Sequence, residues 1–207
     1  MKALANEEEY LEHLDYLIDL SQKIDTKEIT ILTGANGSGK SLLRSFMTER
    51  FRKDSNKKVK SVSMEFRTSS NNSFGALGGI GQDSSWMATS YNTYNLMTRI
   101  IKAAKDSPEG TGYIVLDEIE IGCSEETILC FIDYLNKELK EIKELGIGVL
   151  IITHSRIVVE KLNSDSFVDL QELTKEQWLN RKIIPTTIEE LENNDFFKAI
   201  RGSLSGN

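Results

Sequence analysis

Short apolar runs alternate with segments whose apolar residues recur at helical spacing along most of the chain. Runs that are apolar, or that alternate apolar and polar residues, predict strands at 29–33, 58–66, 113–116, 147–153 and 166–170. Segments with helical spacing predict helices at 7–23, from 41 onward, and at 91–105, 125–145, 155–162, 175–181 and 188–201. This alternation predicts an α/β fold with a mostly parallel sheet, covered by helices on both faces and joined by right-handed crossovers.

The length of the chain, 207 residues, suits one domain with a sizeable core. We expect residues 1–207 to form that single domain, with an N-terminal helix in 1–27, a core in 28–162 and a C-terminal strand and helices in 163–207. Residues 68–89 are rich in serine, asparagine and glycine, which predicts a long loop. Long loops inside a compact domain are usually functional.

The first chemical signal directly follows the strand predicted at 29–33. The chain there reads Gly34, Ala35, Asn36, Gly37, Ser38, Gly39, Lys40, Ser41, Leu42. Glycines let the backbone curl so that successive N–H groups point at phosphate oxygens, which a Cβ would obstruct. Lys40 offers a positive charge to the β- and γ-phosphates, Ser41 offers a hydroxyl to Mg²⁺, and the helix that follows directs its positive end at the same phosphates. A chance glycine-rich turn is the alternative, but the flanking strand and helix favour a phosphate-binding loop (the P loop) that takes ATP with Mg²⁺.

A second signal ends the strand predicted at 113–116. Asp117 and Glu118 follow its apolar residues at the sheet edge where open parallel sheets bind ligands. Asp117 is suited to hold Mg²⁺ through its water shell together with Ser41, and Glu118 to orient the water that attacks the γ-phosphate. Hydrolysis is therefore favoured over transfer to a small acceptor. The alternative is a plain solvated loop, and Glu120, two residues on, either shapes the site or faces water.

A third signal ends the strand predicted at 147–153. His154 would lie at the same sheet edge, where a histidine can donate a hydrogen bond to the γ-phosphate and report its presence. A satisfied loop histidine is the alternative. For Ser155 we favour the role of N-cap of the next helix. His13 is the only other histidine, and we expect it on the surface.

The P loop and the polar ends of these two strands resemble the motifs of ATP-binding-cassette ATPases over about 29–162. The resemblance is to the soluble branch that includes chromosome-maintenance, DNA-repair and phage-encoded or defence-associated ATPases. It implies a P-loop NTPase fold and two nucleotides sandwiched between head-to-tail domains, hence an ATP-dependent homodimer or a partner subunit. It also implies a role for each matching residue: phosphate binding for Lys40, magnesium binding for Ser41 and Asp117, catalytic base for Glu118, and γ-phosphate switch for His154.

The chain departs from that family in three places. The signature Leu-Ser-Gly-Gly-Gln does not occur, and its nearest substitutes are the stretches 84–86 and 88–92, in which we favour Ser90, with a plain N-cap as the alternative. The glutamine that follows the second strand in the family is also missing, which leaves only Gln82. Little chain precedes the first strand, so the small sheet that flanks adenine is reduced or absent. Tyr16 could stack on adenine, but core packing is favoured.

The net charge of −7 argues against a chain-wide nucleic-acid surface. Nucleic acid remains a possible partner only through a local basic cluster, which is more often a solvated loop: Lys53, Lys57, Lys58 and Lys60. No apolar run has the length of a signal peptide or a membrane span, so we expect a soluble, cytoplasmic protein.

Two cysteines, Cys123 and Cys130, have no histidine near them in sequence, which favours packing over a zinc site or a disulfide. Trp178 is expected to anchor the C-terminal segment on the rest of the domain. That segment either covers the sheet edge or binds a partner, and the first is the commoner arrangement.

Three functional hypotheses remain open. The first is a Mg-dependent ATPase that dimerises on binding ATP. The second is a small-molecule kinase, which shares the P loop and the parallel sheet but needs an arginine-rich lid, whereas the arginines between the two carboxylate motifs are dispersed. The third is a nucleotide-binding regulatory module with little hydrolysis, which the missing signature makes more plausible.

Overall fold

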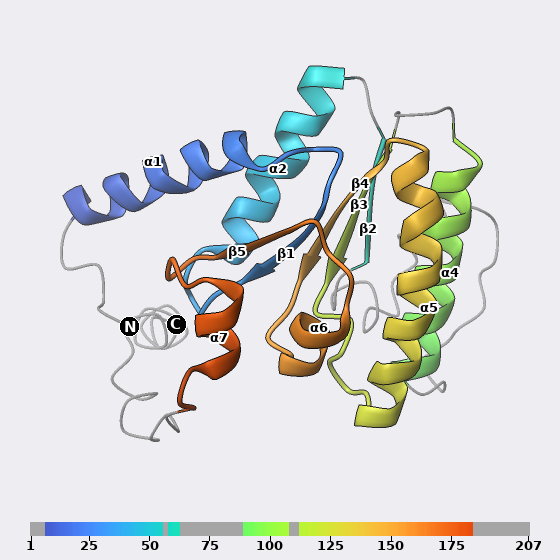
Figure 1. Cartoon of the computed structure of the whole chain (residues 1–207). Coiled ribbons are helices and arrows are strands. Elements are labelled where there is room, and N and C mark those ends of the chain that lie inside the picture. The colour runs from blue at the N-terminus through green and yellow to red at the C-terminus, as the bar shows by residue number, and fades with distance from the viewer. Residues whose placement is uncertain (1–6, 56–57, 63–88, 108–111, 184–207) are drawn as a thin grey trace, which may run out of the picture.

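The computed structural model describes residues 7–55, 58–62, 89–107 and 112–183 (Figure 1). Strands β1 to β5 all pair in parallel in one sheet, in the order β2-β3-β4-β1-β5. Their bounds are Ile29–Thr33, Lys58–Val62, Gly112–Asp117, Gly148–Ile152 and Ser166–Asp169. The helices are α1 Glu7–Lys23, α2 Lys40–Ser55, α4 Thr89–Lys105, α5 Glu125–Glu144, α6 Arg156–Lys161 and α7 Lys175–Asn180.

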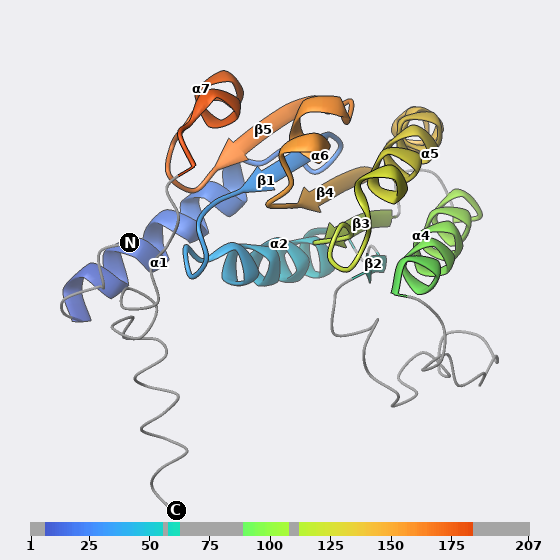
Figure 2. The same ribbon diagram turned by 90° about the horizontal axis from the view of Figure 1, so that it is seen from below.

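Helices cover both faces of the sheet, so the predicted α/β fold with a parallel sheet is confirmed. Figure 2 shows α1 and α2 on one side of the sheet, and α5 and α6 on the other. The hydrophobic core is split accordingly, because successive strand residues point to opposite faces. In β4, Val149 and Ile151 belong to the cluster under α4, α5 and α6, whereas Leu150 and Ile152 belong to the cluster under α1 and α2.

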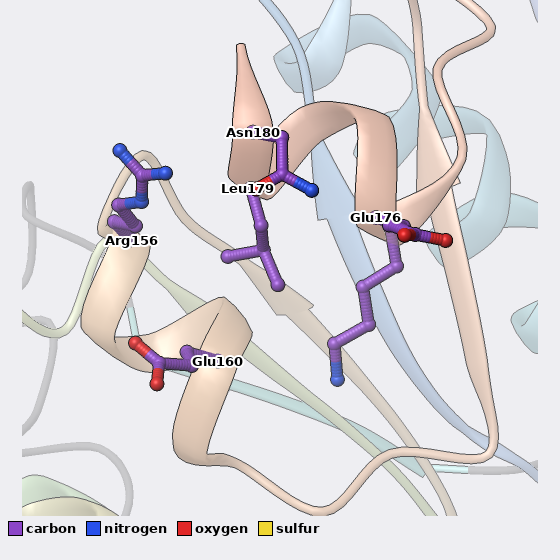
Figure 3. Close-up of a pocket in the computed structure, with 6 residues that line it drawn as sticks. Arg156, Glu160, Glu176, Leu179 and Asn180 are labelled. Atoms are coloured by element: carbon purple, nitrogen blue, oxygen red, sulfur yellow. The ribbon is translucent and has the colours of Figure 1, made fainter.

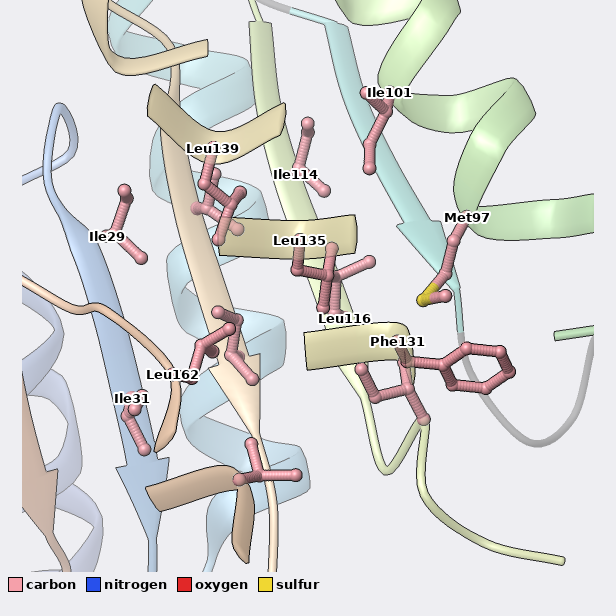
Figure 4. Close-up of a cluster of buried hydrophobic side chains, with 14 of the residues drawn as sticks. Ile29, Ile31, Met97, Ile101, Ile114, Leu116, Phe131, Leu135, Leu139 and Leu162 are labelled. Atoms are coloured by element: carbon pink, nitrogen blue, oxygen red, sulfur yellow. The ribbon is translucent and has the colours of Figure 1, made fainter. Parts of the chain in front are cut away.

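The larger cluster lies between the sheet and the α4–α5 face (Figure 4). Ile114 and Leu116 of β3 meet Leu135 and Leu139 of α5 there, and these four side chains are 0–2% exposed. Each contributes on the order of 2 kcal/mol by leaving water. The strand that carries the second chemical signal is therefore held rigidly up to the residue before Asp117.

Helix ends follow local capping rules. The Ser155 side chain accepts a hydrogen bond from Val158 N, which confirms its role as the N-cap of α6. Thr174 and Gln177 form a reciprocal capping box at the start of α7. At the C-terminus of α1, Arg50 of α2 donates to the carbonyls of Ser21, Gln22 and Ile24, and this fastens α1 beside the P-loop helix.

Trp178 is 3% exposed and packs edge-on against Phe167 of β5, which agrees with its predicted role as an anchor for the C-terminal segment. The Arg181 guanidinium lies 3.4 Å from the centre of the Trp178 ring. The packing role predicted for both cysteines is wrong for Cys130, which is exposed on α5, whereas Cys123 packs against the core. Spacing alone placed Cys130 on no particular face of that helix.

Three sequence predictions fall partly or wholly outside the described residues. They are the end of the strand predicted at 58–66, the long loop at 68–89 and the helix at 188–201. No helix in the described part of the chain is long and apolar enough to cross a membrane.

Gly148 lies at a crowded start of β4. A Cβ there would be 2.1 Å from the Thr26 carbonyl oxygen and 2.8 Å from Cε2 of Tyr113. Gly148→Ala should therefore lower the free energy of unfolding by about 3 kcal/mol, because buried backbone must shift to admit a methyl group. Gly112→Ala is the matched control, since its Cβ would meet Ile147 at an ordinary 3.6 Å. Chemical denaturation measures both, and equal losses would contradict the prediction.

Candidate nucleotide-binding site

The P loop leaves the end of β1 and turns sharply into α2. Gly37 and Gly39 have φ values of 74° and 97°, in the left-handed region that favours glycine. A Cβ on Gly39 would also lie 2.6 Å from Cδ1 of Leu17, because α1 packs against the outside of the loop. Leu43 N donates to the Gly39 carbonyl at 2.8 Å and closes the first turn of α2. The loop is thus a glycine cradle at a helix N-terminus, which fits an anion such as phosphate.

Lys40 lies at the centre of this cradle and is 9% exposed. Its Nζ donates to the carbonyl oxygens of Gly34 at 3.1 Å and Ala35 at 2.9 Å. Burial lowers the pKa of Lys40, and the negative charges of Glu118, Asp117 and Asp169 counteract this. The ammonium group is therefore ringed by carboxylates and held by carbonyls, which are weaker partners for it than phosphate oxygens.

Asp117 forms an ion pair with Arg44, one turn of α2 beyond Lys40. The two side chains are only 17% and 24% exposed. This contact brings the first turn of α2, which includes Ser41 and Leu42, to the end of β3. Hard oxygen ligands such as the Ser41 hydroxyl and the Asp117 carboxylate suit Mg²⁺.

Among the described residues, no group of three or more acidic, histidine or cysteine side chains could hold a metal ion by itself. Magnesium in nucleotide sites needs only one or two protein ligands, because phosphates and water complete its shell. The donor set at Ser41 and Asp117 therefore fits a magnesium ion that arrives with a nucleotide.

Glu118 adopts a left-handed backbone conformation, with φ of 51°. Such a conformation is uncommon for a residue with a side chain and is concentrated at functional sites. The backbone N of Glu118 donates to the Ile152 carbonyl at 2.9 Å, and its Oε1 lies 3.3 Å from Nε2 of His154. The ends of β3 and β4 thus bring together two residues that are 36 positions apart in sequence.

His154 is kept neutral near pH 7. Removal of its ring from water lowers the pKa of His154, and the positive charges of Lys40 and Arg181 lower it further. A neutral imidazole carries one N–H donor and one acceptor, so it can contact a carboxylate or a phosphate oxygen without adding charge. The two cations also show that His154 lies on the same side of the sheet edge as the P-loop lysine.

Glu120 shapes the site, which decides between the two roles left open for it. Its Oε1 accepts hydrogen bonds from the Thr153 hydroxyl at 2.5 Å and from His154 N at 3.0 Å. The Thr153 hydroxyl oxygen in turn accepts from Ser155 N at 2.9 Å. Glu120 therefore fixes the chain around His154 from the neighbouring strand end.

Residues of α1 reach the P loop from the other side, which the sequence did not indicate. Nε2 of His13 lies 3.2 Å from the Ser38 carbonyl oxygen, so the expected surface position of His13 is wrong. Helical spacing brings His13 and Leu17 to the same face, and that face meets the loop. Tyr16 packs against the adjoining core, as favoured, and burial raises its pKa.

Asp169 supports the same side of the loop from the end of β5. It is 5% exposed, and it accepts from the Thr33 hydroxyl at 2.8 Å and from Gln171 N at 3.0 Å. The turn that it holds packs Leu170 next to Gly34. A polar residue after an apolar strand was the available signal, but the short run at 166–170 was not examined for one.

Two other groups of predicted residues have different outcomes. Ala35 is partly buried and Asn36 exposed in the loop. Ser90 lies inside the first turn of α4 instead of capping it, since that helix begins at Thr89. The other substitutes for the signature, at 84–86 and at Gln82, lie outside the described residues.

A cavity of about 530 Å³ lies between α6 and α7, apart from the P loop (Figure 3). Its walls carry two basic and two acidic side chains, with one leucine and one asparagine: Arg156, Lys175, Glu160, Glu176, Leu179 and Asn180. No residue of the P loop lines it. This cavity is therefore not the phosphate site.

No protein-family model matches the chain, and no curated protein matches its sequence. Three solved structures resemble it in part. The ATP-binding cassette MJ0796, as a dimer bound to ADP and Pi, matches with a TM-score of 0.43 and 13% identity over 64% of this chain and 77% of that one. The Pif1 helicase from Candida albicans gives 0.39 and 14% over 82% and 40%, and PCH-2 of C. elegans gives 0.39 and 16% over 78% and 42%.

This chain spans less than half the length of the last two proteins, and at TM-scores below 0.5 the likeness carries no argument about activity. The chain has an α/β P-loop NTPase fold. That assignment agrees with its own topology, a parallel sheet with the P loop between β1 and α2.

Proposed function

We propose that the chain is a soluble, cytoplasmic ATPase of the ATP-binding-cassette type, which binds Mg-ATP at the P loop and hydrolyses it. The observation that supports this best is the convergence of four side chains at one sheet edge. Lys40 feels the charges of Asp117 and Glu118, and Glu118 contacts His154. A P loop alone explains phosphate binding, whereas the carboxylates and the histidine beside it supply the groups that hydrolysis needs.

Each part of the site has one task in this proposal. The P-loop N–H groups, from Gly34 to Ser41, and Lys40 bind the phosphates and stabilise the charge that develops on them. Glu118 accepts a hydrogen bond from the attacking water and orients it, while neutral His154 donates one to the terminal phosphate. Ser41 and Asp117 would hold Mg²⁺, which when bound neutralises charge on the phosphate oxygens.

The P loop is half of a site in this proposal. The chain lacks the run Leu-Ser-Gly-Gly-Gln that would approach a nucleotide from a second domain. A second copy or a partner subunit completes the site, with Ser90 in the first turn of α4 as the candidate contact. Helix dipoles at such N-termini favour phosphate. The net charge of −7 gives no support to a nucleic-acid partner.

One contact favours the regulatory module as a second candidate. The pairing of Asp117 with Arg44 engages the expected magnesium ligand within the chain itself. A protein that binds nucleotide but hydrolyses little of it would have that property. Among the described residues, no contact favours the kinase, since Arg44 and Arg50 are engaged with Asp117 and with the end of α1.

Phosphate release, measured over a wide range of protein concentration, tests the proposal. Turnover per molecule should rise with concentration, because a dimer must form before ATP is hydrolysed. Turnover that is independent of concentration and needs an added acceptor would indicate a kinase. Tight Mg-ATP binding with no phosphate release would indicate the regulatory module.

A further inference from the structure

Arg44 lies where no phosphate-binding motif requires a cation. It follows Lys40 by four residues on α2, so the two side chains share a face of the helix. It donates from Nη1 to Oδ2 of Asp117. Because both partners are mostly buried, water and salt screen their attraction only weakly.

This ion pair sets Arg44 against a metal ion. Asp117 is the carboxylate that the proposed function gives to Mg²⁺, and both cations need its negative charge. Arginine stays charged at any physiological pH, so the competition does not relax by loss of a proton. A cation that binds Asp117 must displace the guanidinium or share the carboxylate with it.

We propose that Arg44 is an internal competitor of Mg²⁺ for Asp117, so that the metal enters the site only together with the phosphates of a nucleotide. This inference rests on the proposed function. It deepens that function by making metal entry conditional on nucleotide binding.

The charges around the pair support this coupling. Before nucleotide binds, the cations Lys40 and Arg44 face the carboxylates Asp117 and Glu118 in a balanced cluster. Triphosphate adds strong negative charge and oxygens with which a planar guanidinium forms bidentate hydrogen bonds. A displaced Arg44 thus has a new partner only when phosphate is present. Mg²⁺ alone offers it none.

The test is calorimetric titration with ATP at a series of MgCl₂ concentrations, which yields the magnesium concentration at half-maximal enhancement of ATP affinity. Arg44→Gln removes the competing charge and should lower this midpoint by about tenfold. Arg44→Lys keeps a cation without the planar fork and should lower it by about threefold. Arg52→Gln, on the exposed part of the same helix, is the matched control and should leave it unchanged.

The outcomes separate the inference from the proposed function. An unchanged midpoint in Arg44→Gln would mean that Arg44 only fastens α2 to β3, and a raised midpoint would mean that it assists the metal; either result overturns the inference. Failure of the wild-type chain to bind ATP at any magnesium concentration would instead defeat the proposed function. Far-UV circular dichroism checks folding, and if Arg44→Gln does not fold, the shift in Arg44→Lys decides.

Discussion

Replacing Lys40 with alanine is expected to weaken ATP binding by about a hundredfold or more, because charge-assisted hydrogen bonds to phosphate are lost from the centre of the cradle. Lys40 is the buried cation that the loop itself encloses. In the absence of phosphate its donors are used on the carbonyls of Gly34 and Ala35, so the side chain is already in position. Little ordering entropy then opposes its transfer to a phosphate.

Calorimetric titration with Mg-ATP measures this loss. Lys53→Ala is the control, since Lys53 is an exposed lysine of the same helix that pairs only with Glu49 among the contacts described for it. The thermal unfolding midpoint of each variant shows whether the fold survives. Binding by Lys40→Ala within a few-fold of the wild type would remove the P loop from the site.

Glu118→Gln should leave Mg-ATP affinity within about threefold and slow phosphate release by about 10²- to 10⁴-fold, the usual contribution of a general base. The amide keeps the size of the side chain and can still contact His154, but it does not accept a proton from water. The left-handed backbone at Glu118 is unaltered by this change. Binding and turnover should therefore separate.

Single-turnover phosphate release with saturating enzyme measures the chemical step, and titration measures binding. Glu144→Gln, at the exposed end of α5, is the control and should hydrolyse ATP at the wild-type rate. Unchanged turnover in Glu118→Gln would transfer the role of base to another residue. A parallel loss of binding would mean that Glu118 supports the loop instead of the reaction.

The elements were predictable because their signals are local. Periodicity gave α1 as 7–23 and β1 as 29–33, which are the bounds in the structure. The P loop was recognisable because glycine, lysine and serine must stand at fixed spacings to surround a phosphate. Asp117 and Glu118 were candidates because polar residues that end buried strands gather at one sheet edge.

The partners of these residues were not predictable, because they depend on the order of strands and on helix rotation. Arg44 meets Asp117 across 73 positions of sequence, and His13 meets Ser38 across 25. The helical spacing of Arg44 and Lys40 was a usable hint, but nothing in the sequence said which strand end that helix face would meet. Glu120 could equally have faced water.

The sequence by itself determined the local chemistry: a loop that can surround phosphate, two carboxylates and a histidine after buried strands, and the alternation that builds a parallel sheet. Only the tertiary structure decided how these parts meet. It placed β4 between β1 and β3, so that His154 contacts Glu118, and it turned α2 so that Arg44 holds the expected magnesium ligand. The reason is physical: spacing along a chain sets which face a residue occupies, whereas the packing of whole elements sets what that face touches.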